Sequence, residues 1–231
     1  MLTIRPAAER GHANHGWLDS NFSFSFADYY DPAHMGFHAL RVINEDRVAP
    51  ATGFGKHPHR DMEILTYVLE GAVKHEDSTG ASETLVPGEL QHMSAGTGVR
   101  HSEMNPSNDE TLHLLQIWLA PNRLGILPKY EQKRFTVQEE PNKLHLLASS
   151  DARDGSFRIY SDAELLAAKL DAGGSVSHTF KLGNGWLQVA SGSVSVAGGT
   201  LQTGDGIALE GEPSITVASD SGAEFLLFDL A

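Results

Sequence analysis

Most of the chain consists of short, mainly apolar runs that are separated by turn residues. Examples are EILTYVLE (63–70), TLHLLQIWLA (111–120) and EFLLFDL (224–230). Turn sequences rich in Gly, Pro, Asn and Asp recur at intervals of roughly 8–12 residues. Short strands punctuated in this way are typical of a sandwich or barrel, so we predict an all-β fold.

The same succession of elements occurs twice along the chain. EILTYVLEGAVKHED (63–77) and LVPGEL (85–90) are matched later by WLQVASGSVSVAGG (186–199) and LQTGDGIAL (201–209). Each set is a strand that ends at a glycine, a second short strand, a turn and a Gly-acidic pair. We therefore predict two β-domains, residues 1–135 and 136–231, joined through a segment rich in Pro, Asn and charge.

One segment conflicts with this scheme. DAELLAAKL (162–170) has high helical propensity and an acidic start that suits a helix N-terminus. It stands where the second β-unit should open, and on topology we predict a strand.

Composition limits the chemistry that the chain can carry. The 231 residues are 40% hydrophobic and 20% charged, which is typical of a globular protein with a real core. The absence of cysteine excludes disulfides, thiolate nucleophiles, Cys-based zinc sites and iron–sulfur clusters. Any metal must therefore be held by imidazole and carboxylate groups.

Charge and hydropathy limit the partners. The net charge of −13 repels nucleic acids and anionic membranes, so we expect neither as a direct partner. No stretch is apolar over the length of a signal peptide or a membrane span. We expect a soluble, cytoplasmic protein, and a monomer by default.

The histidines concentrate in the first half, where ten of the twelve lie at or before His113. Side chains alternate along a strand, so His57 and His59 share one face, and His101 and Glu103 share one face too. If the two strands are neighbours, three imidazoles and one carboxylate converge. Such a set suits a divalent first-row metal and leaves room for further ligands in an octahedral shell.

Two alternatives stay open at this point. A single His-x-His in a strand is more often incidental than a metal site. Glu63 lies six residues after His57, so in an unbroken strand it would face the same side and rival Glu103 as the carboxylate ligand. It could equally accept a hydrogen bond that orients an imidazole, and spacing does not separate the two roles.

These motifs resemble a known family. GKHPHRDMEILTYVLEG (55–71) looks like the first cupin motif and PGELQHMSAGTGVRHSEMN (87–105) like the second. Together with HEDSTG (75–80) and LQIW (115–118) they are similar to pirins, which are bicupins. GHANHGWLDSNFSFSFADYYDP (11–32) looks like bacterial pirin-like quercetin 2,3-dioxygenases. The resemblance is strong through residue 135 and weaker beyond it.

The resemblance implies a fold and a metal centre. The fold is a bicupin, two barrel or jelly-roll cupin domains packed together, with one metal in the N-terminal cupin. By the pirin pattern the ligands are His57, His59, His101 and Glu103, and Glu63 has a supporting role. The C-terminal cupin lacks an HxH pair and is expected to be structural. Fe(II) is the favoured metal, and Mn, Ni, Co, Cu or Zn is compatible with the same ligands.

The resemblance also implies a reaction, which is cleavage of a flavonol such as quercetin by O₂ with release of CO. Glu103 is then the candidate general base. The aromatic segment FSFSFADYY (22–30) either lines a pocket for a flat ligand or buries its phenylalanines in the core, and we favour the core. The alternative function is a metal-binding, redox-sensing regulatory protein without turnover. An enzyme requires a roomy cavity that reaches the metal, whereas a regulatory module does not.

Overall fold

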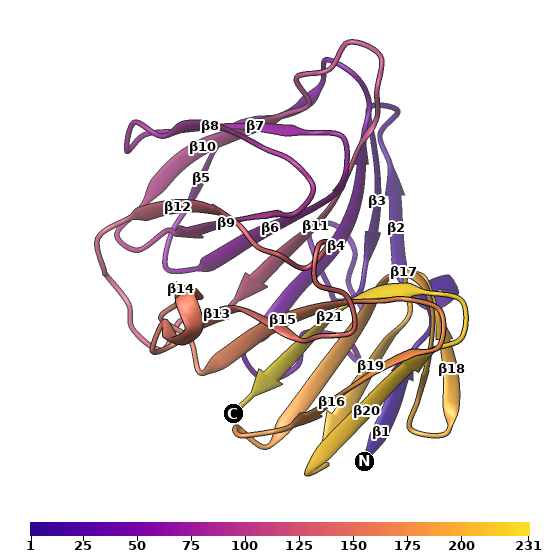
Figure 1. Ribbon diagram of the computed structural model, residues 1–231. Coiled ribbons are helices and arrows are strands. Elements are labelled where there is room, and N and C mark those ends of the chain that lie inside the picture. The colour runs from indigo at the N-terminus through magenta and orange to yellow at the C-terminus, as the bar shows by residue number, and fades with distance from the viewer.

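The computed structural model describes residues 1–231 and is built almost entirely from strands (Figure 1). The strands up to residue 134 are β1 (Leu2–Arg5), β2 (Gly11–Asn14), β3 (Leu18–Phe22), β4 (Leu40–Val48), β5 (Gly53–His59), β6 (Glu63–Glu70), β7 (Val73–Asp77), β8 (Ser82–Leu85), β9 (Glu89–Ser94), β10 (Val99–Met104), β11 (Leu112–Leu119) and β12 (Lys129–Arg134). Those that follow are β13 (His145–Ser149), β14 (Phe157–Arg158), β15 (Ala163–Leu170), β16 (Gly174–Thr179), β17 (Asn184–Val196), β18 (Gly199–Gln202), β19 (Gly206–Glu210), β20 (Ser214–Ser219) and β21 (Ala223–Leu230).

Helical structure is limited to two short 3₁₀ turns, η1 (Ala7–Glu9) and η2 (Arg153–Gly155). The prediction of an all-β fold is therefore confirmed. Neither turn is long and apolar enough to cross a membrane.

The N-terminal cupin is a sandwich of two open sheets. A seven-stranded sheet runs in the order β12-β9-β6-β11-β4-β3-β2, and a four-stranded sheet runs in the order β5-β10-β7-β8. Figure 1 shows the smaller sheet lying over the larger one. The sheets stay open at their ends, so the unit is a jelly-roll sandwich rather than a closed barrel.

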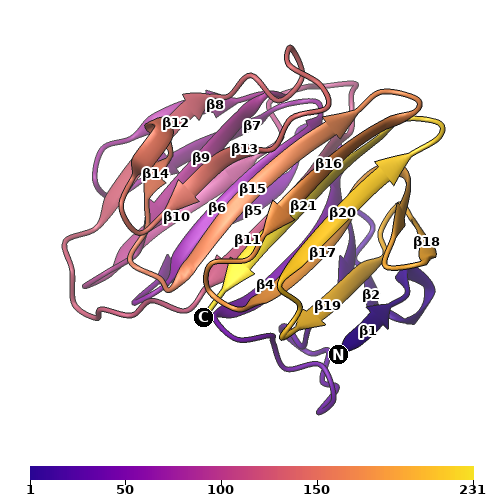
Figure 2. The same cartoon turned by 60° about the horizontal axis from the view of Figure 1, so that its bottom comes forward.

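The C-terminal cupin is built on a ten-stranded sheet with the main order β1-β19-β17-β21-β15-β13-β14. Strands β16, β18 and β20 join it through the long strand β17 and complete the second sandwich. Strand β1, from the beginning of the chain, pairs with β19. In both ribbon views the two termini lie at this cupin (Figure 2).

The largest hydrophobic cluster lies between the two cupins. Alternation along β6 sends Leu65 and Tyr67 into this cluster and turns Ile64 and Val68 into the N-terminal cupin. From the other side, β21 contributes Phe228. The cluster contains 23 buried residues, and each large apolar side chain buried there contributes roughly 1.5–3 kcal/mol of hydrophobic free energy.

Residues 163–170 form strand β15, which confirms the prediction made on topology. Leu165 and Ala167 belong to the cluster between the cupins, while Leu166 and Ala168 face the interior of the C-terminal cupin. A strand that is buried on both faces has a continuous apolar run and no visible alternation. Pairing with β13 and β21 outweighs a helical preference of a few tenths of a kcal/mol per residue.

Candidate metal centre

Three of the predicted ligands meet on two neighbouring strands. His57 and His59 lie at the end of β5, His101 lies on β10, and the register places His101 directly opposite His57. The ring centroids are 4.4–4.8 Å apart, and one nitrogen from each ring lies within 4.8 Å of the others. Three imidazole nitrogens at this separation can bind a single cation.

Hydrogen bonds indicate which nitrogen His57 and His101 offer. Nδ1–H of His57 donates to the carbonyl oxygen of Gly55 at 2.8 Å, which leaves Nε2 free. Nε2 of His101 is buried and has no hydrogen-bond partner. A buried nitrogen lone pair with no partner is unfavourable in a protein interior, and a bound metal would satisfy it.

His101 is held from behind by a chain of two further groups. Its Nδ1 lies 3.4 Å from Nδ1 of His75, and Nε2 of His75 lies 3.1 Å from a carboxylate oxygen of Asp77. Burial opposes ionisation of Asp77, but hydrogen bonds from Thr79 and His75 hold the pKa of its carboxyl below the usual value. In the arrangement that these contacts allow, the carboxylate accepts from His75 Nε2–H, His75 Nδ1 accepts from His101 Nδ1–H, and His101 keeps a lone pair at Nε2.

The electrostatics of the cluster favour neutral rings. Burial, followed by the neighbouring imidazoles, lowers the pKa of His59 to about 4 and that of His101 to about 3. At neutral pH both rings are therefore unprotonated and able to ligate. Together with the unpartnered nitrogen of His101, this shows that the donor set fits a divalent metal.

Glu103 lies on β10, two residues after His101, and is held by a row of polar side chains. Thr66, Gln91 and Gln116 stand opposite one another in register on β6, β9 and β11, all buried. Oε1 of Glu103 lies 3.2 Å from the Thr66 hydroxyl and 3.0 Å from Gln91 Nε2, and Oε2 accepts from Gln116 Nε2 at 2.8 Å. These contacts fix the position of the carboxylate and leave Oε2 with fewer partners than Oε1.

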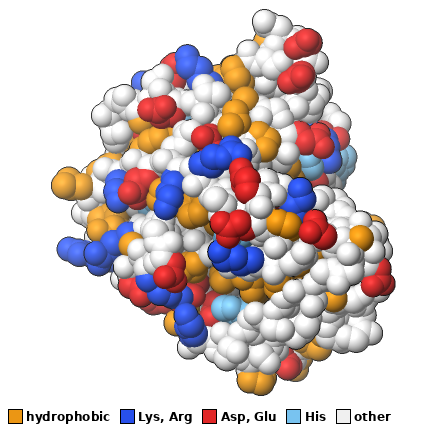
Figure 3. Space-filling view, viewed as in Figure 1, with side chains coloured by type: hydrophobic (Ala, Val, Ile, Leu, Met, Phe, Trp, Pro, Cys, Tyr) orange, Lys and Arg blue, Asp and Glu red, His pale blue; other side chains and the backbone are white.

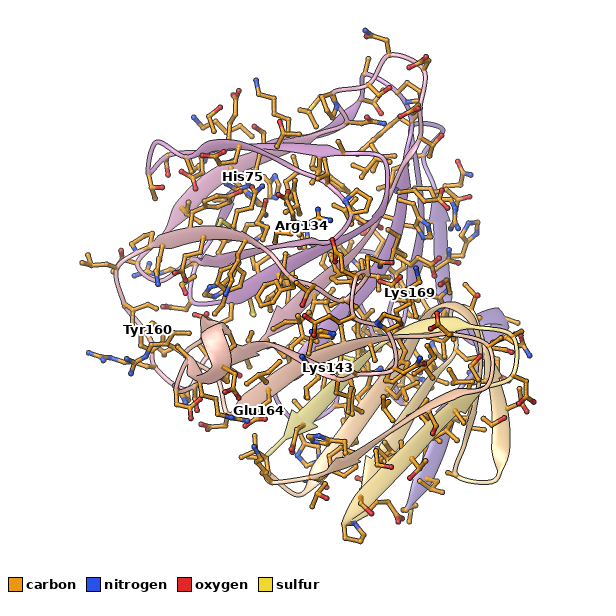
Figure 4. All side chains as sticks on the ribbon, in the orientation of Figure 1. His75, Arg134, Lys143, Tyr160, Glu164 and Lys169 are labelled. Carbon is orange, nitrogen blue, oxygen red and sulfur yellow. The ribbon has the colours of Figure 1, made fainter.

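His75 gives the cluster a second possible composition. Two sets of residues have ligand atoms within 4.8 Å of one another, and they share His101. One set adds His57 and His59, and the other adds His75 and Glu103. The structure thus brings Glu103 to the cluster on the side of His75, a histidine that the sequence analysis did not single out (Figure 4).

The cluster borders a cavity of about 600 Å³. Its lining includes His57, His59 and Glu103. Aromatic rings supply much of the remaining wall, where Trp17 meets Phe54 edge to face at 5.2 Å, Phe26 meets Trp118 at 5.3 Å, and Phe22 packs against Phe26 at 5.8 Å. The cavity can therefore hold a flat aromatic molecule beside the histidines.

Family models account for both halves of the chain. The model described as Pirin matches residues 3–119, and the model described as Quercetinase C-terminal cupin domain matches residues 146–230. The chain belongs to the pirin family. The resemblance inferred from the sequence is thus confirmed, and the predicted bicupin fold with it.

Relatives of this pirin match it over its full length. It is 53% identical to quercetin 2,3-dioxygenase of Escherichia coli (strain K12), with 100% of this chain and 99% of the relative covered. The crystal structure of YhhW from Escherichia coli superposes with a TM-score of 0.96 at 52% identity, covering 100% of this chain and 98% of the other. The structure of bacterial pirin YhhW in complex with nickel(II) gives a TM-score of 0.94 at 52% identity and covers 100% and 99%.

In this pirin Glu63 does not face the histidine cluster. Strand β5 ends at His59, Asp61 has a left-handed backbone with φ of 46°, and β6 begins in the other sheet. The unbroken strand that would have made Glu63 a rival ligand does not form. Its carboxylate instead accepts from His92 Nε2 at 2.6 Å and from the Ser94 hydroxyl at 2.9 Å.

The aromatic segment of residues 22–30 divides between the two proposed roles. Phe22 and Phe26 line the cavity, whereas Phe24 packs against Trp186 in the cluster between the cupins. Tyr30 is 72% exposed. Phe22 and Phe24 are buried as predicted, whereas Phe26 is only partly buried, because β3 ends at Phe22 and the chain turns.

Three polar groups of the same cavity have unused hydrogen-bonding capacity. Oδ1 of Asn44 and Nε1 of Trp118 are buried without a partner. Asp46 makes a single side-chain hydrogen bond, which it accepts from the hydroxyl of Ser20. Burial raises the pKa of Asp46 to about 7, and the nearby carboxylates of Glu103 and Glu45 add to the effect.

A second hollow, of about 740 Å³, is lined by residues of β12 and of β13, η2, β15 and β16. Five basic side chains line it, but Arg134, Lys143 and Arg153 already form ion pairs with Glu139, Glu140 and Glu164. Charges of both signs mix over this face in the space-filling view (Figure 3), and Figure 4 places Arg134, Lys143 and Glu164 along the junction of the cupins. None of the metal-capable residue groups lies there.

Proposed function

We propose that this pirin is a quercetin 2,3-dioxygenase-like oxidoreductase that cleaves a flavonol such as quercetin with O₂ and releases CO. The observation that carries the proposal is the cavity of about 600 Å³, which is walled by aromatic rings and opens directly onto His57, His59 and Glu103. The name of the full-length relatives supports the same reaction. The flavonol loses one carbon as CO and both atoms of O₂ enter the products, so no further oxidant or reductant is required.

We propose His57, His59, His101 and Glu103 as the ligands of one divalent metal, and Fe(II) as the physiological ion. The nickel(II) complex of the bacterial relative supports a divalent ion in this pirin. A metal of this kind supplies Lewis acidity, which lowers the pKa of a hydroxyl group bound to it.

The side chains of the cavity divide the remaining work. Oε2 of Glu103 accepts only one hydrogen bond from the protein, so it is the atom that we propose takes the proton of the flavonol hydroxyl. The hydrogen bonds from Thr66, Gln91 and Gln116 keep this carboxylate in place during the transfer. The aromatic walls orient the flat ligand and exclude water from it.

The proposal requires only one chain. Every residue that lines the cavity lies before residue 119, within the proposed N-terminal domain of residues 1–135, and the proposed C-terminal domain of residues 136–231 supports it from outside. We propose that the monomer is active. Size-exclusion chromatography with simultaneous activity measurement checks this, since activity confined to a dimer peak would contradict it.

The test is oxygen consumption with quercetin, using protein loaded with Fe(II) without oxygen. Oxygen uptake should match flavonol loss one to one, and the Glu103→Gln variant should lose it. Glu63→Gln makes the same chemical change on the other sheet, where the carboxylate pairs with His92 away from the cluster, and serves as the matched control, with activity retained per bound metal. One metal per chain without oxygen uptake would instead favour a regulatory, redox-sensing protein.

A further inference from the structure

Strand β4 presents two polar side chains to the cavity beside the histidine cluster. Asn44 and Asp46 are two residues apart and therefore share a face of the strand. Asp46 stands opposite Ser20 on β3, and Asn44 stands opposite Gln116, the residue that donates to Glu103. The two side chains thus extend the polar row beneath Glu103 toward the edge of the sheet.

Both side chains are buried and incompletely paired. Each is only 3% exposed. Oδ1 of Asn44 has no hydrogen-bond partner, and the one partner of the Asp46 carboxyl is the hydroxyl of Ser20. Buried polar groups in native proteins are nearly always hydrogen-bonded, so unused acceptors on a cavity wall indicate a ligand that donates hydrogen bonds.

The rest of the wall defines what kind of ligand this is. The neighbouring rings of Phe22, Phe26 and Trp118 accept a flat aromatic body, and Nε1 of Trp118 is a buried donor without a partner. A phenolic hydroxyl donates one hydrogen bond and accepts others, so two hydroxyls on one ring complement the two acceptors, and either hydroxyl accepts from the indole N–H. A methyl ether in the same place could not donate.

We propose that Asn44 and Asp46 form a hydroxyl-binding subsite, which makes the cavity selective for aromatic ligands that carry hydroxyl groups in addition to the one presented to the metal centre. The inference rests on the proposed function, since it describes how the same cavity distinguishes among flavonols. Burial raises the pKa of Asp46, so the protonated and the ionised forms both occur near neutral pH. Either form can accept a hydrogen bond from a phenol.

The experiment measures binding without turnover. Quenching of tryptophan fluorescence is titrated in the absence of oxygen with quercetin and with 3-hydroxyflavone, whose only hydroxyl is at position 3, using metal-loaded protein. The wild type should bind quercetin at least about tenfold more tightly. Asn44→Leu and Asp46→Leu should lose most of this preference while their affinity for 3-hydroxyflavone stays within about twofold of the wild type.

Asp19→Leu is the matched control. Asp19 lies on β3 next to Ser20, and its side chain is 46% exposed and paired with His12 outside the cavity. This variant should keep the wild-type preference. If a β4 variant does not fold, wild-type protein titrated with quercetin methylated at every hydroxyl except that at position 3 gives the same information, because the methylated ligand should bind as weakly as 3-hydroxyflavone or more weakly.

Two results would overturn the subsite: equal affinity of the wild type for all three ligands, or full preference in both β4 variants. Oxygen uptake with 3-hydroxyflavone separates this failure from failure of the proposed function. If that flavonol is consumed while the preference is missing, the dioxygenase stands and the subsite falls. If quercetin binds with the predicted preference but no flavonol is consumed, the subsite stands and the dioxygenase falls.

Discussion

The two cupins share a fold but fill their interiors in opposite ways. In the C-terminal cupin a single cluster of 16 buried apolar residues occupies the space between the sheets. In the N-terminal cupin the apolar interior is split into clusters of seven and four residues. Between them lie the polar row of Thr66, Gln91 and Gln116, the carboxylate of Glu103 and the histidines. Polar and metal-capable side chains therefore occupy the space that apolar side chains fill in the C-terminal cupin.

The contrast shows how a protein tolerates a polar interior. The seven-stranded sheet gives part of its inner face to hydrogen-bonded groups, and its outer face joins the 23-residue cluster between the cupins. Stability that the N-terminal cupin cannot gain from its own interior comes from the face that it shares with its neighbour. The C-terminal cupin thus stabilises the N-terminal cupin through their shared cluster, although it contributes no proposed ligand.

The largest expected effect is the loss of metal when His101 is changed to alanine. This variant should bind no stoichiometric metal yet remain a folded β-protein, because His101 is a proposed ligand and belongs to none of the apolar clusters. Metal content per chain and far-UV circular dichroism measure the two properties. His178→Ala, which removes the partner of Asp229 in the C-terminal cupin, is the control and should keep one metal. A tightly bound equivalent in His101→Ala would refute the ligand assignment.

The converse change removes core volume from the C-terminal cupin. Phe225 is fully buried in its apolar cluster, so Phe225→Ala should lower the free energy of unfolding by about 3–5 kcal/mol. Metal bound per folded chain should not change, since no ligand lies in this cupin. Urea unfolding with parallel metal analysis tests both points. Equal stability of the variant and the wild type would show that Phe225 does not contribute to the stability of the C-terminal cupin.

A third variant addresses the support behind the cluster. His75→Phe keeps an aromatic ring stacked on Tyr130, 4.4 Å away in the native protein, but removes the acceptor for His101 Nδ1–H. Metal affinity should fall by about 10- to 100-fold, as it does when other outer-shell partners are removed. Competition with a chelator measures the change. A loss as complete as that of His101→Ala would make His75 a ligand and favour the alternative set with Glu103.

The smallest expected effect is on the pH dependence of stability. The folded pKa of Asp46, about 7, exceeds its ordinary value of 3.8, so between these values the native state holds a proton that the unfolded chain has released. Stability of the metal-free protein should therefore fall as pH rises through this window, by about 1 kcal/mol between pH 6 and pH 7 from this group. Urea unfolding of wild type and Asp46→Asn at the two pH values tests this, and identical slopes would contradict it.

The site residues that could be predicted from the sequence lie two residues apart in the chain. His57 and His59, like His101 and Glu103, could be found because strand alternation places residues two apart on one face. His75, Asp46 and Gln116 were missed because only the pairing of strands far apart in sequence brings them to the site. His75 and Asp77 do show the same spacing of two, and that was the available signal.

Glu63 illustrates the opposite error. Its spacing from His57 indicated the same face, but the count assumed one continuous strand. The left-handed residue Asp61 breaks it and moves the chain into another sheet. Asp61 was the available signal, because aspartate is depleted in strands and tolerates the left-handed conformation.

Strand β1 ties the beginning of the chain to its end. It extends the sheet that β21 completes, while the buried side chain of Arg5 donates to the carbonyl oxygen of Ser23 and to the hydroxyl of Tyr29 in the N-terminal cupin. During synthesis these first residues leave the ribosome long before β19, their partner, exists. The N-terminal cupin can therefore fold before β1 has a partner strand to pair with. A fragment that starts near residue 136 lacks β1. The edge of β19 is then exposed and can pair with other molecules.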